Sequence, residues 1–156
     1  MSVIMPGSYD PVTLGHREMI RRVAEREDEV YVVIFNNPAK SYAFSLDDRV
    51  AMLMLAAEEF DNVIVSYSIG YVVDYMREHG IDRIVKGYRN ERDLEWERVQ
   101  AEYNLSHGGY ETELILADEE YLNVSSTMVR DKLKRGESLE GLLPDNVIEY
   151  IKNIKI

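Results

Sequence analysis

The segment from Met5 to His16 reads MPGSYDPVTLGH and joins an apolar stretch to an amphipathic one. Gly7 lets the backbone turn and approach a ligand closely, and Ser8 supplies a hydroxyl group. His16 follows Gly15 at the expected start of a helix, where free backbone amides favour anions. An imidazole in that place could donate a hydrogen bond to a phosphate oxygen as negative charge builds in a transition state. These residue types therefore indicate phosphate chemistry without a covalent intermediate.

A plainer interpretation of the same segment is structural. Gly7 and Pro11 would shape a tight loop, and His16 would be a helix-start residue whose ring is satisfied within the protein. Asp10, directly before Pro11, could be a turn former or could fix the shape of the loop.

Cationic residues appear at two further places. Lys86 and Arg89 flank Gly87 directly after the expected strand Arg83–Val85, and ligands of an open α/β sheet bind beyond the carboxyl ends of its strands. This position favours a phosphate site over ordinary surface charge. Lys40 lies in a loop after another apolar run, where its ammonium group could reach a triphosphate, although a loop lysine is usually only solvated.

Hydroxyl and acidic residues are harder to interpret. A later helix begins with Ser125, Ser126 and Thr127, whose hydroxyls and free amides could bind phosphates or simply cap the helix. Most acidic residues on helices are solvated. We therefore expect a solvated helix surface for Glu91, Asp93, Glu95 and Glu97.

Short apolar runs alternate with longer stretches of helical period along the whole chain. The expected strands are Ser2–Met5, Glu29–Phe35, Asn62–Tyr67, Arg83–Val85 and Glu111–Leu116. The expected helices are Leu14–Arg26, Ser45–Glu59, Val72–His79, Arg92–His107, Thr127–Lys134 and a last one from Pro144 through Ile154. This alternation predicts an α/β fold, a Rossmann-like, doubly wound, five-stranded parallel sheet with helices on both faces and further helices at the carboxyl terminus.

Length and composition narrow the possible functions. The 156 residues predict a single domain, and the absence of cysteine excludes disulfides and thiolate metal clusters and fits a cytoplasmic protein. The start of the chain resembles no export signal, and no uncharged apolar stretch of roughly 18 residues predicts a membrane span. The net charge of −11 disfavours general binding to nucleic acid or to anionic membranes, so a phosphate site must be built locally.

Four segments carry a resemblance to a known family. GSYDPVTLGH is similar to the first signature of the nucleotidyltransferase superfamily, in which Gly is followed by Asp-Pro and then by Thr-x-Gly-His. NNPAKSYAFSLDDRV, VKGYRNERDLEWE and YLNVSSTMVR resemble, in order, three further blocks of the bacterial phosphopantetheine adenylyltransferase family. The similarity runs from Val3 to about Val147 without long insertions.

The resemblance implies that 4′-phosphopantetheine attacks the α-phosphorus of ATP and that dephospho-coenzyme A and pyrophosphate are released. Mg²⁺ would be held mainly by phosphates and water, without a dedicated protein metal site. The family pattern also implies a homohexamer and possible feedback binding of coenzyme A. Ser8 and Lys86 stand where the family usually has Thr and Arg, and both keep the type of hydrogen-bond donor, although lysine lacks the bidentate fork of arginine. Tyr71 replaces a usual Leu in a stretch that resembles the family's loop along the pantetheine arm.

The resemblance also assigns site residues. The implied catalytic residues are His16, Lys40 and Arg89. The implied acceptor contacts are Ser8, Lys40, Val72 and Lys86. The implied ATP contacts are Ser8, Tyr9, His16, Gly87, Tyr88, Arg89, Glu97, Tyr121, Val124, Ser125, Ser126 and Thr127. Two alternatives stay open, namely a sibling nucleotidyltransferase with another phosphorylated acceptor and a nucleotide-binding regulator that has lost catalysis.

Overall fold

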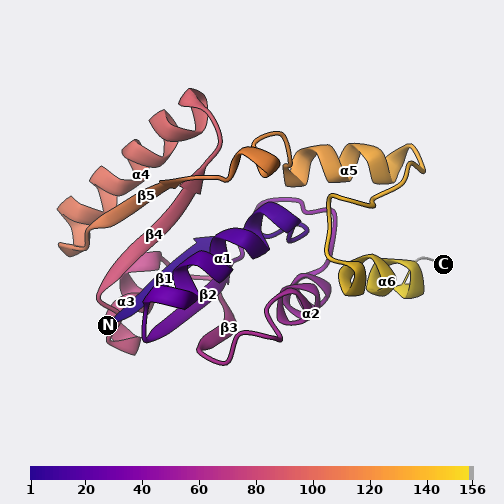
Figure 1. Cartoon of the computed structure of the whole chain (residues 1–156). Coiled ribbons are helices and arrows are strands. Elements are labelled where there is room, and N and C mark those ends of the chain that lie inside the picture. Colours follow the sequence, from indigo (N-terminus) through magenta and orange to yellow (C-terminus); the bar gives the residue numbers. More distant parts are fainter. Residues whose placement is uncertain (155–156) are drawn as a thin grey trace.

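The computed structural model describes residues 1–154 and contains one five-stranded sheet in the order β3-β2-β1-β4-β5 (Figure 1). All neighbouring strands are parallel. The strands are β1 (Ser2–Gly7), β2 (Glu29–Phe35), β3 (Val63–Ser68), β4 (Arg83–Tyr88) and β5 (Thr112–Leu116). The strand order reverses between β1 and β4, which is the place where open α/β sheets bind ligands. The predicted fold class is confirmed.

The helices are α1 (Leu14–Arg26), α2 (Leu46–Ala56), α3 (Val72–His79), α4 (Glu91–Gly108), α5 (Ser126–Lys134) and α6 (Asp145–Ile154), with a short 3-10 helix, η1 (Glu119–Tyr121). Helices cover both faces of the sheet, so the side chains of β1 are buried alternately on each side. Val3 and Met5 join one apolar cluster with residues of α1, α2 and α6, whereas Ile4 joins a second cluster with residues of α3. α4 contacts α3, β4 and β5.

β4 is longer than its sequence predicts. Lys86 and Gly87 pair with Leu114 and Ile115 of β5, so they lie within the strand and not in a turn after it. Lysine and glycine are poor strand formers, but a free neighbouring strand edge outweighs such local preferences. The backbone of Lys86 is therefore held in the sheet, and its side chain projects from a fixed point.

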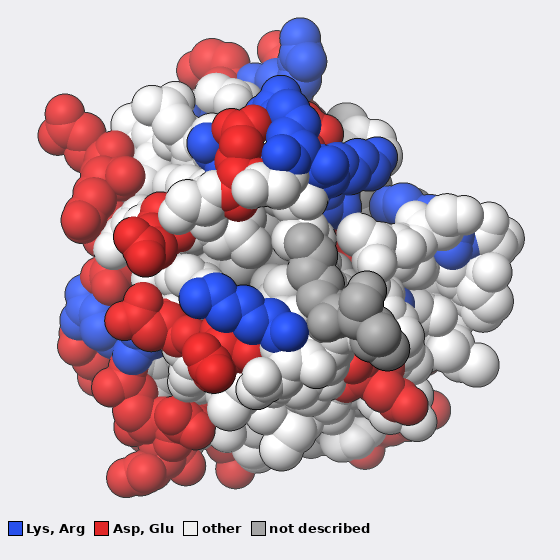
Figure 2. Space-filling view, turned by 90° about the vertical axis from the view of Figure 1, so that its right-hand side faces the viewer, with Lys and Arg blue, Asp and Glu red and all other residues white. Residues whose placement is uncertain are grey.

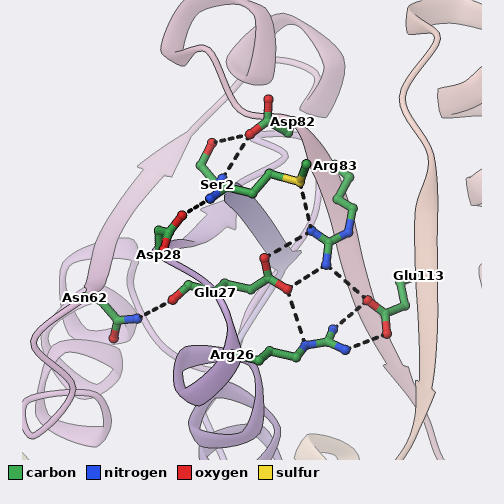
Figure 3. Close-up of polar contacts among 9 residues, drawn as sticks. Ser2, Arg26, Glu27, Asp28, Asn62, Asp82, Arg83 and Glu113 are labelled. Carbon is green, nitrogen blue, oxygen red and sulfur yellow. Dashed lines mark hydrogen bonds and ion pairs between the residues drawn. The ribbon is translucent and has the colours of Figure 1, made fainter.

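An ion-pair network lies at the amino-terminal ends of the strands (Figure 3). Arg83 at the start of β4 donates to Glu27 at 2.6 Å, and Arg26 donates to Glu113 of β5 at 2.8 Å. Single exposed ion pairs contribute little to stability, whereas a network of several charges contributes more. The network joins the end of α1 to β4 and β5. The carboxyl ends of the strands lie on the opposite side of the sheet, where a ligand can bind.

Charge is unevenly spread over the surface. In the face shown in Figure 2, most basic side chains gather toward the top, with some acidic ones among them, and most acidic side chains lie along the left and lower edges. Within residues 1–154, no helix combines the length and the apolar character that crossing a membrane requires.

Candidate active site

A cavity opens where β1 and β4 separate. The two strands pair only at Val3 with Arg83 and at Ile4 with Ile84, although both strands continue beyond these residues. The cavity between their carboxyl ends has a volume of about 350 Å³. Lys86 Nζ reaches across the opening and donates a hydrogen bond to the Pro6 carbonyl oxygen at 3.1 Å. The cavity therefore lies at the reversal of strand order.

Three segments that are far apart in the sequence meet around this cavity. They are the loop between β1 and α1, the end of β4 with the start of α4, and the connection from η1 into α5. Its walls contain every residue that the sequence assigned to ATP: Ser8, Tyr9, His16, Gly87, Tyr88, Arg89, Glu97, Tyr121, Val124, Ser125, Ser126 and Thr127.

The loop after β1 is held in shape by Tyr9. This residue has a φ of 46°, in the left-handed region that side chains other than glycine seldom adopt. Its hydroxyl donates to the Met5 carbonyl oxygen at 2.9 Å, and its ring lies so close to Gly7 that an added Cβ there would be 3.0 Å from a ring carbon. A larger residue at position 7 would therefore push the tyrosine ring away by a few tenths of an ångström.

Asp10 fixes the loop from the other side. Its buried carboxylate accepts the backbone N–H groups of Ala43 and Phe44 at 2.8 and 2.9 Å. These two residues lie just before Ser45, the N-cap of α2, so the contact joins the loop after β1 to the loop after β2. Asp10 also lies in a turn with Pro11, so the structure supports both interpretations of this residue.

His16 lies in the first turn of α1 in a reciprocal capping arrangement. Its Nδ1 accepts the backbone N–H of Thr13 at 3.0 Å, and the Thr13 hydroxyl oxygen accepts the His16 backbone N–H at 3.2 Å. The neutral ring therefore carries its hydrogen on Nε2. Burial, together with the charges of Lys86 and Arg89, lowers the pKa of His16 to about 4. At neutral pH the residue is an uncharged hydrogen-bond donor.

Two of the acidic residues on α4 face the cavity, which corrects the prediction of a uniformly solvated surface. Asp93 and Glu97 line the cavity, whereas Glu91 and Glu95 are exposed. The acidic residues at 93 and 97 are one helical turn apart, so they share a face of α4. Burial raises the pKa of Glu97, and the neighbouring Lys86 opposes this shift.

The hydroxyl cluster at the start of α5 mostly serves the protein's own structure. Ser125 caps the helix by accepting the Met128 backbone N–H at 3.1 Å, and Ser126 donates to the Pro11 carbonyl oxygen at 2.8 Å. The Ser126 bond ties α5 to the loop after β1. What this helix start presents to a ligand is therefore chiefly its free backbone amides.

A second cavity of about 240 Å³ adjoins the first. Ser8 and Lys86 line both cavities, and Val72 lines the second. Three of the four predicted acceptor contacts thus lie together. Lys40 lines neither cavity and is exposed, with its Nζ 5.7 Å from the centre of the Tyr42 ring.

Comparison with known proteins identifies the family. The cytidylyltransferase-like family model matches residues 4–132. A phosphopantetheine adenylyltransferase from Corynebacterium diphtheriae is 39% identical over 149 residues, which is 95% of this chain and 94% of the relative. Relatives of the same name from Corynebacterium efficiens and Thermobifida fusca are 37% and 36% identical over 97% and 96% of this chain, and over 96% and 92% of their own lengths. The chain belongs to the phosphopantetheine adenylyltransferase family.

Arg130 also lines the first cavity, although the sequence analysis assigned it no role in the site. It donates to the Asp10 carbonyl oxygen at 2.9 Å and to the Thr127 hydroxyl at 3.0 Å. The signal that could have found it is its position on α5, one turn after Thr127 and within the YLNVSSTMVR segment.

The carboxylates around the first cavity are engaged by other groups of the protein, which limits how a divalent cation could be bound there. Within residues 1–154, no three His, Asp or Glu side chains are grouped to bind a metal ion. The Asp10 carboxylate is occupied by backbone amides, and Asp93 and Glu97 face cationic side chains. This donor set fits a Mg²⁺ ion that arrives with substrate phosphates and retains water ligands.

Proposed function

We propose that this protein transfers the adenylyl group of ATP to 4′-phosphopantetheine, giving dephospho-coenzyme A and pyrophosphate. The observation that carries the proposal is the convergence of the three signature segments on one cavity between β1 and β4, in a chain whose relatives bear the name of this enzyme.

In this reaction a phosphate oxygen of the acceptor attacks the α-phosphorus of ATP. The bond from that phosphorus to the bridging oxygen of the departing pyrophosphate breaks, and both electrons leave with that oxygen. The acceptor phosphate is already ionised near neutral pH, so no group on the protein has to remove a proton. Alignment of the reactants and stabilisation of the developing charge are then sufficient for catalysis.

The two adjoining cavities supply that alignment. We assign ATP to the first cavity and the acceptor to the second, so that the reacting groups meet at the wall that the two cavities share. This wall is formed by Pro6, Gly7, Ser8, Lys86 and Glu97. His16 donates from Nε2 to an oxygen of the reacting phosphates, and Arg89 contributes positive charge. The uncharged imidazole matches this role, because it donates a hydrogen bond and does not exchange a proton.

Lys40 is proposed to contact the acceptor phosphate. It lies in the loop between β2 and α2, outside the second cavity. The role therefore requires the flexible Lys40 side chain, or the loop that carries it, to turn toward the cavity when the acceptor binds. Replacement of Lys40 by alanine should then weaken acceptor binding and leave ATP binding unchanged.

Further expectations accompany the proposal. The chain would act as a single catalytic domain in the cytoplasm, with Mg²⁺ as the companion of ATP. The family pattern supports assembly as a homohexamer and feedback binding of coenzyme A.

The experiment is to supply ATP and Mg²⁺ with a set of acceptors and to measure pyrophosphate release. The set contains 4′-phosphopantetheine, nicotinamide mononucleotide, a sugar phosphate and unphosphorylated pantetheine, which lacks the attacking oxygen. Pyrophosphate should form with 4′-phosphopantetheine alone. Faster release with another phosphorylated acceptor would indicate a sibling transferase, and ATP binding without release for any acceptor would indicate a regulator.

A further inference from the structure

Asp93 and Glu97 of α4 each face one of the two cations that β4 brings to the first cavity. We call these two residues the α4 carboxylate pair. Asp93 lies next to Arg89 and Glu97 lies next to Lys86. Side chains four residues apart on a helix point the same way, so one helix face meets both cations.

Asp93 holds Arg89 by several hydrogen bonds. One carboxylate oxygen accepts the Arg89 backbone N–H at 3.1 Å and the Nε–H at 3.0 Å, and the other accepts from Nη2 at 3.4 Å. A guanidinium group has five N–H donors, so the donors on Nη1 and one on Nη2 are left for a phosphate. The carboxylate thus fixes the plane of the guanidinium group and the direction of its free edge.

Glu97 and the Pro6 carbonyl oxygen hold Lys86 between the two cavities. The ammonium group donates to Pro6 at 3.1 Å and lies 3.5 Å from Glu97 Oε2. That carboxylate oxygen is buried and has no hydrogen-bond partner within the described part of the chain, and only 12% of the Glu97 side chain is exposed. Glu97 therefore interacts with Lys86 by charge at close range, in a place that water reaches poorly.

The carboxylate pair places two negative charges beside a site for a polyphosphate. Like charges repel, so this pair opposes the binding of ATP in its ground state. An interaction that weakens substrate binding can still favour reaction if it holds other groups in the geometry of the transition state. Arg89 and Lys86 are long, flexible side chains, and without a fixed partner each samples many rotamers.

We propose that Asp93 and Glu97 are positioning residues that hold Arg89 and Lys86 in the geometry required for adenylyl transfer, at a cost in ATP affinity. This inference rests on the proposed function. It assigns Glu97 an action through Lys86, which differs from the direct contact with ATP that the family resemblance implies.

The test compares Glu97→Gln and Asp93→Asn with a matched control, Glu95→Gln, which changes an exposed acid on the same helix. Each conservative variant should lower kcat by about 10- to 100-fold, because misplacing a group that contacts the reacting atoms has effects of that size. The KM for ATP should stay unchanged or fall, because a repelling charge is removed. The Glu95→Gln control should have the same kcat and the same KM for ATP as the protein without substitutions.

A double-mutant cycle with Lys86→Met isolates the coupling. If Glu97 acts through Lys86, then Glu97→Gln should lower kcat by less than about threefold when Lys86 is already methionine. Equal effects in both backgrounds would overturn the proposal. A raised KM for ATP with unchanged kcat would also overturn it, since that result means direct nucleotide binding by Glu97.

Two controls keep the outcomes separate. Thermal unfolding and calorimetric ATP binding establish that each variant is folded, and if Glu97→Gln does not fold, Asp93→Asn and its cycle with Arg89→Met give the decision. If the protein without any substitution catalyses no adenylyl transfer, that result would contradict both the proposed function and this inference. An active protein whose Asp93 and Glu97 variants keep full kcat would contradict this inference alone.

Discussion

The backbone N–H of Thr13 donates a hydrogen bond to Nδ1 of His16 at 3.0 Å, and this contact determines which ring nitrogen can serve a ligand. With Nδ1 acting as acceptor, the hydrogen of the neutral ring is on Nε2. The residue that caps α1 therefore also fixes the tautomer of the proposed catalytic imidazole. Local helix capping and the chemistry of the site depend on the same pair of residues.

Replacement of His16 by glutamine should lower turnover far more than it alters ATP binding. The donor acts on charge that develops during the reaction, so we expect kcat to fall by about 10²- to 10³-fold and the KM for ATP to change by less than about threefold. Steady-state kinetics measure both values. His107→Gln, at an exposed residue near the end of α4, is the matched control. A raised KM with unchanged kcat would argue against this role.

Stability should depend on pH through His16. Its pKa is about 4 in the folded protein and near the usual 6.5 in the unfolded chain. Between these pH values the unfolded chain binds a proton that the folded protein does not. The contribution of His16 is therefore constant above pH 6.5, and stability declines as the pH falls toward 4, by at most about 1.4 kcal/mol per pH unit.

Urea denaturation at pH 7, 6, 5 and 4.5 measures this effect. The free energy of unfolding of the unchanged protein should fall more steeply with decreasing pH than that of His16→Gln, in which no group titrates at this position. Carboxylates titrate alike in both proteins and cancel in the difference. Parallel curves would contradict the lowered pKa.

Removal of the Asp10 carboxylate should destabilise the protein. Asp10→Ala leaves the buried backbone N–H of Phe44 and that of its neighbour Ala43 without their acceptor. We expect a loss of about 1–3 kcal/mol in the free energy of unfolding, the usual cost of one buried N–H group without an acceptor, because Ala43 is exposed and its N–H group can bind water instead. Urea denaturation measures the loss, and Asp61→Ala, at an exposed residue, should change stability by less than about 0.5 kcal/mol. Similar values for the two variants would show that Asp10 does not hold the loop.

Arg130 should contribute to ATP use although the sequence analysis did not assign it. Arg130→Met removes a cavity cation that is oriented by Asp10 and Thr127. Because charge-assisted bonds to phosphate are strong, we expect kcat/KM for ATP to fall by about 10- to 100-fold. Arg135→Met is the control, since 63% of that side chain is exposed and it pairs with Glu137 at the surface. Equal activity of the two variants would remove Arg130 from the site.

Much of the architecture follows from local patterns. The alternation of apolar runs and helical periods predicts the parallel sheet, and cap residues such as Ser45 and Ser125 mark where α2 and α5 begin. The extension of β4 through Lys86 and Gly87 is not predictable locally, because it depends on pairing with β5, which follows some 25 residues later in the chain.

The site shows the same division. The glycine, histidine and hydroxyl signatures predict its walls, because the carboxyl ends of parallel strands meet at one edge of the sheet. Asp93 and Glu97 resemble Glu91 and Glu95 in sequence, and only the packing of α4 beside β4 separates them. Lys40 is the converse case, since its motif places it in the site and the conformation of its loop leaves it outside both cavities.

The reverse reaction tests the central claim most directly. The protein is supplied with dephospho-coenzyme A, pyrophosphate and Mg²⁺, and the products are measured by luminescence for ATP and by mass spectrometry for 4′-phosphopantetheine. The two products should appear in equal amounts, about 10²- to 10³-fold more slowly with His16→Gln. No ATP from the unchanged protein, or equal rates from both proteins, would contradict an adenylyl-transfer site built around His16.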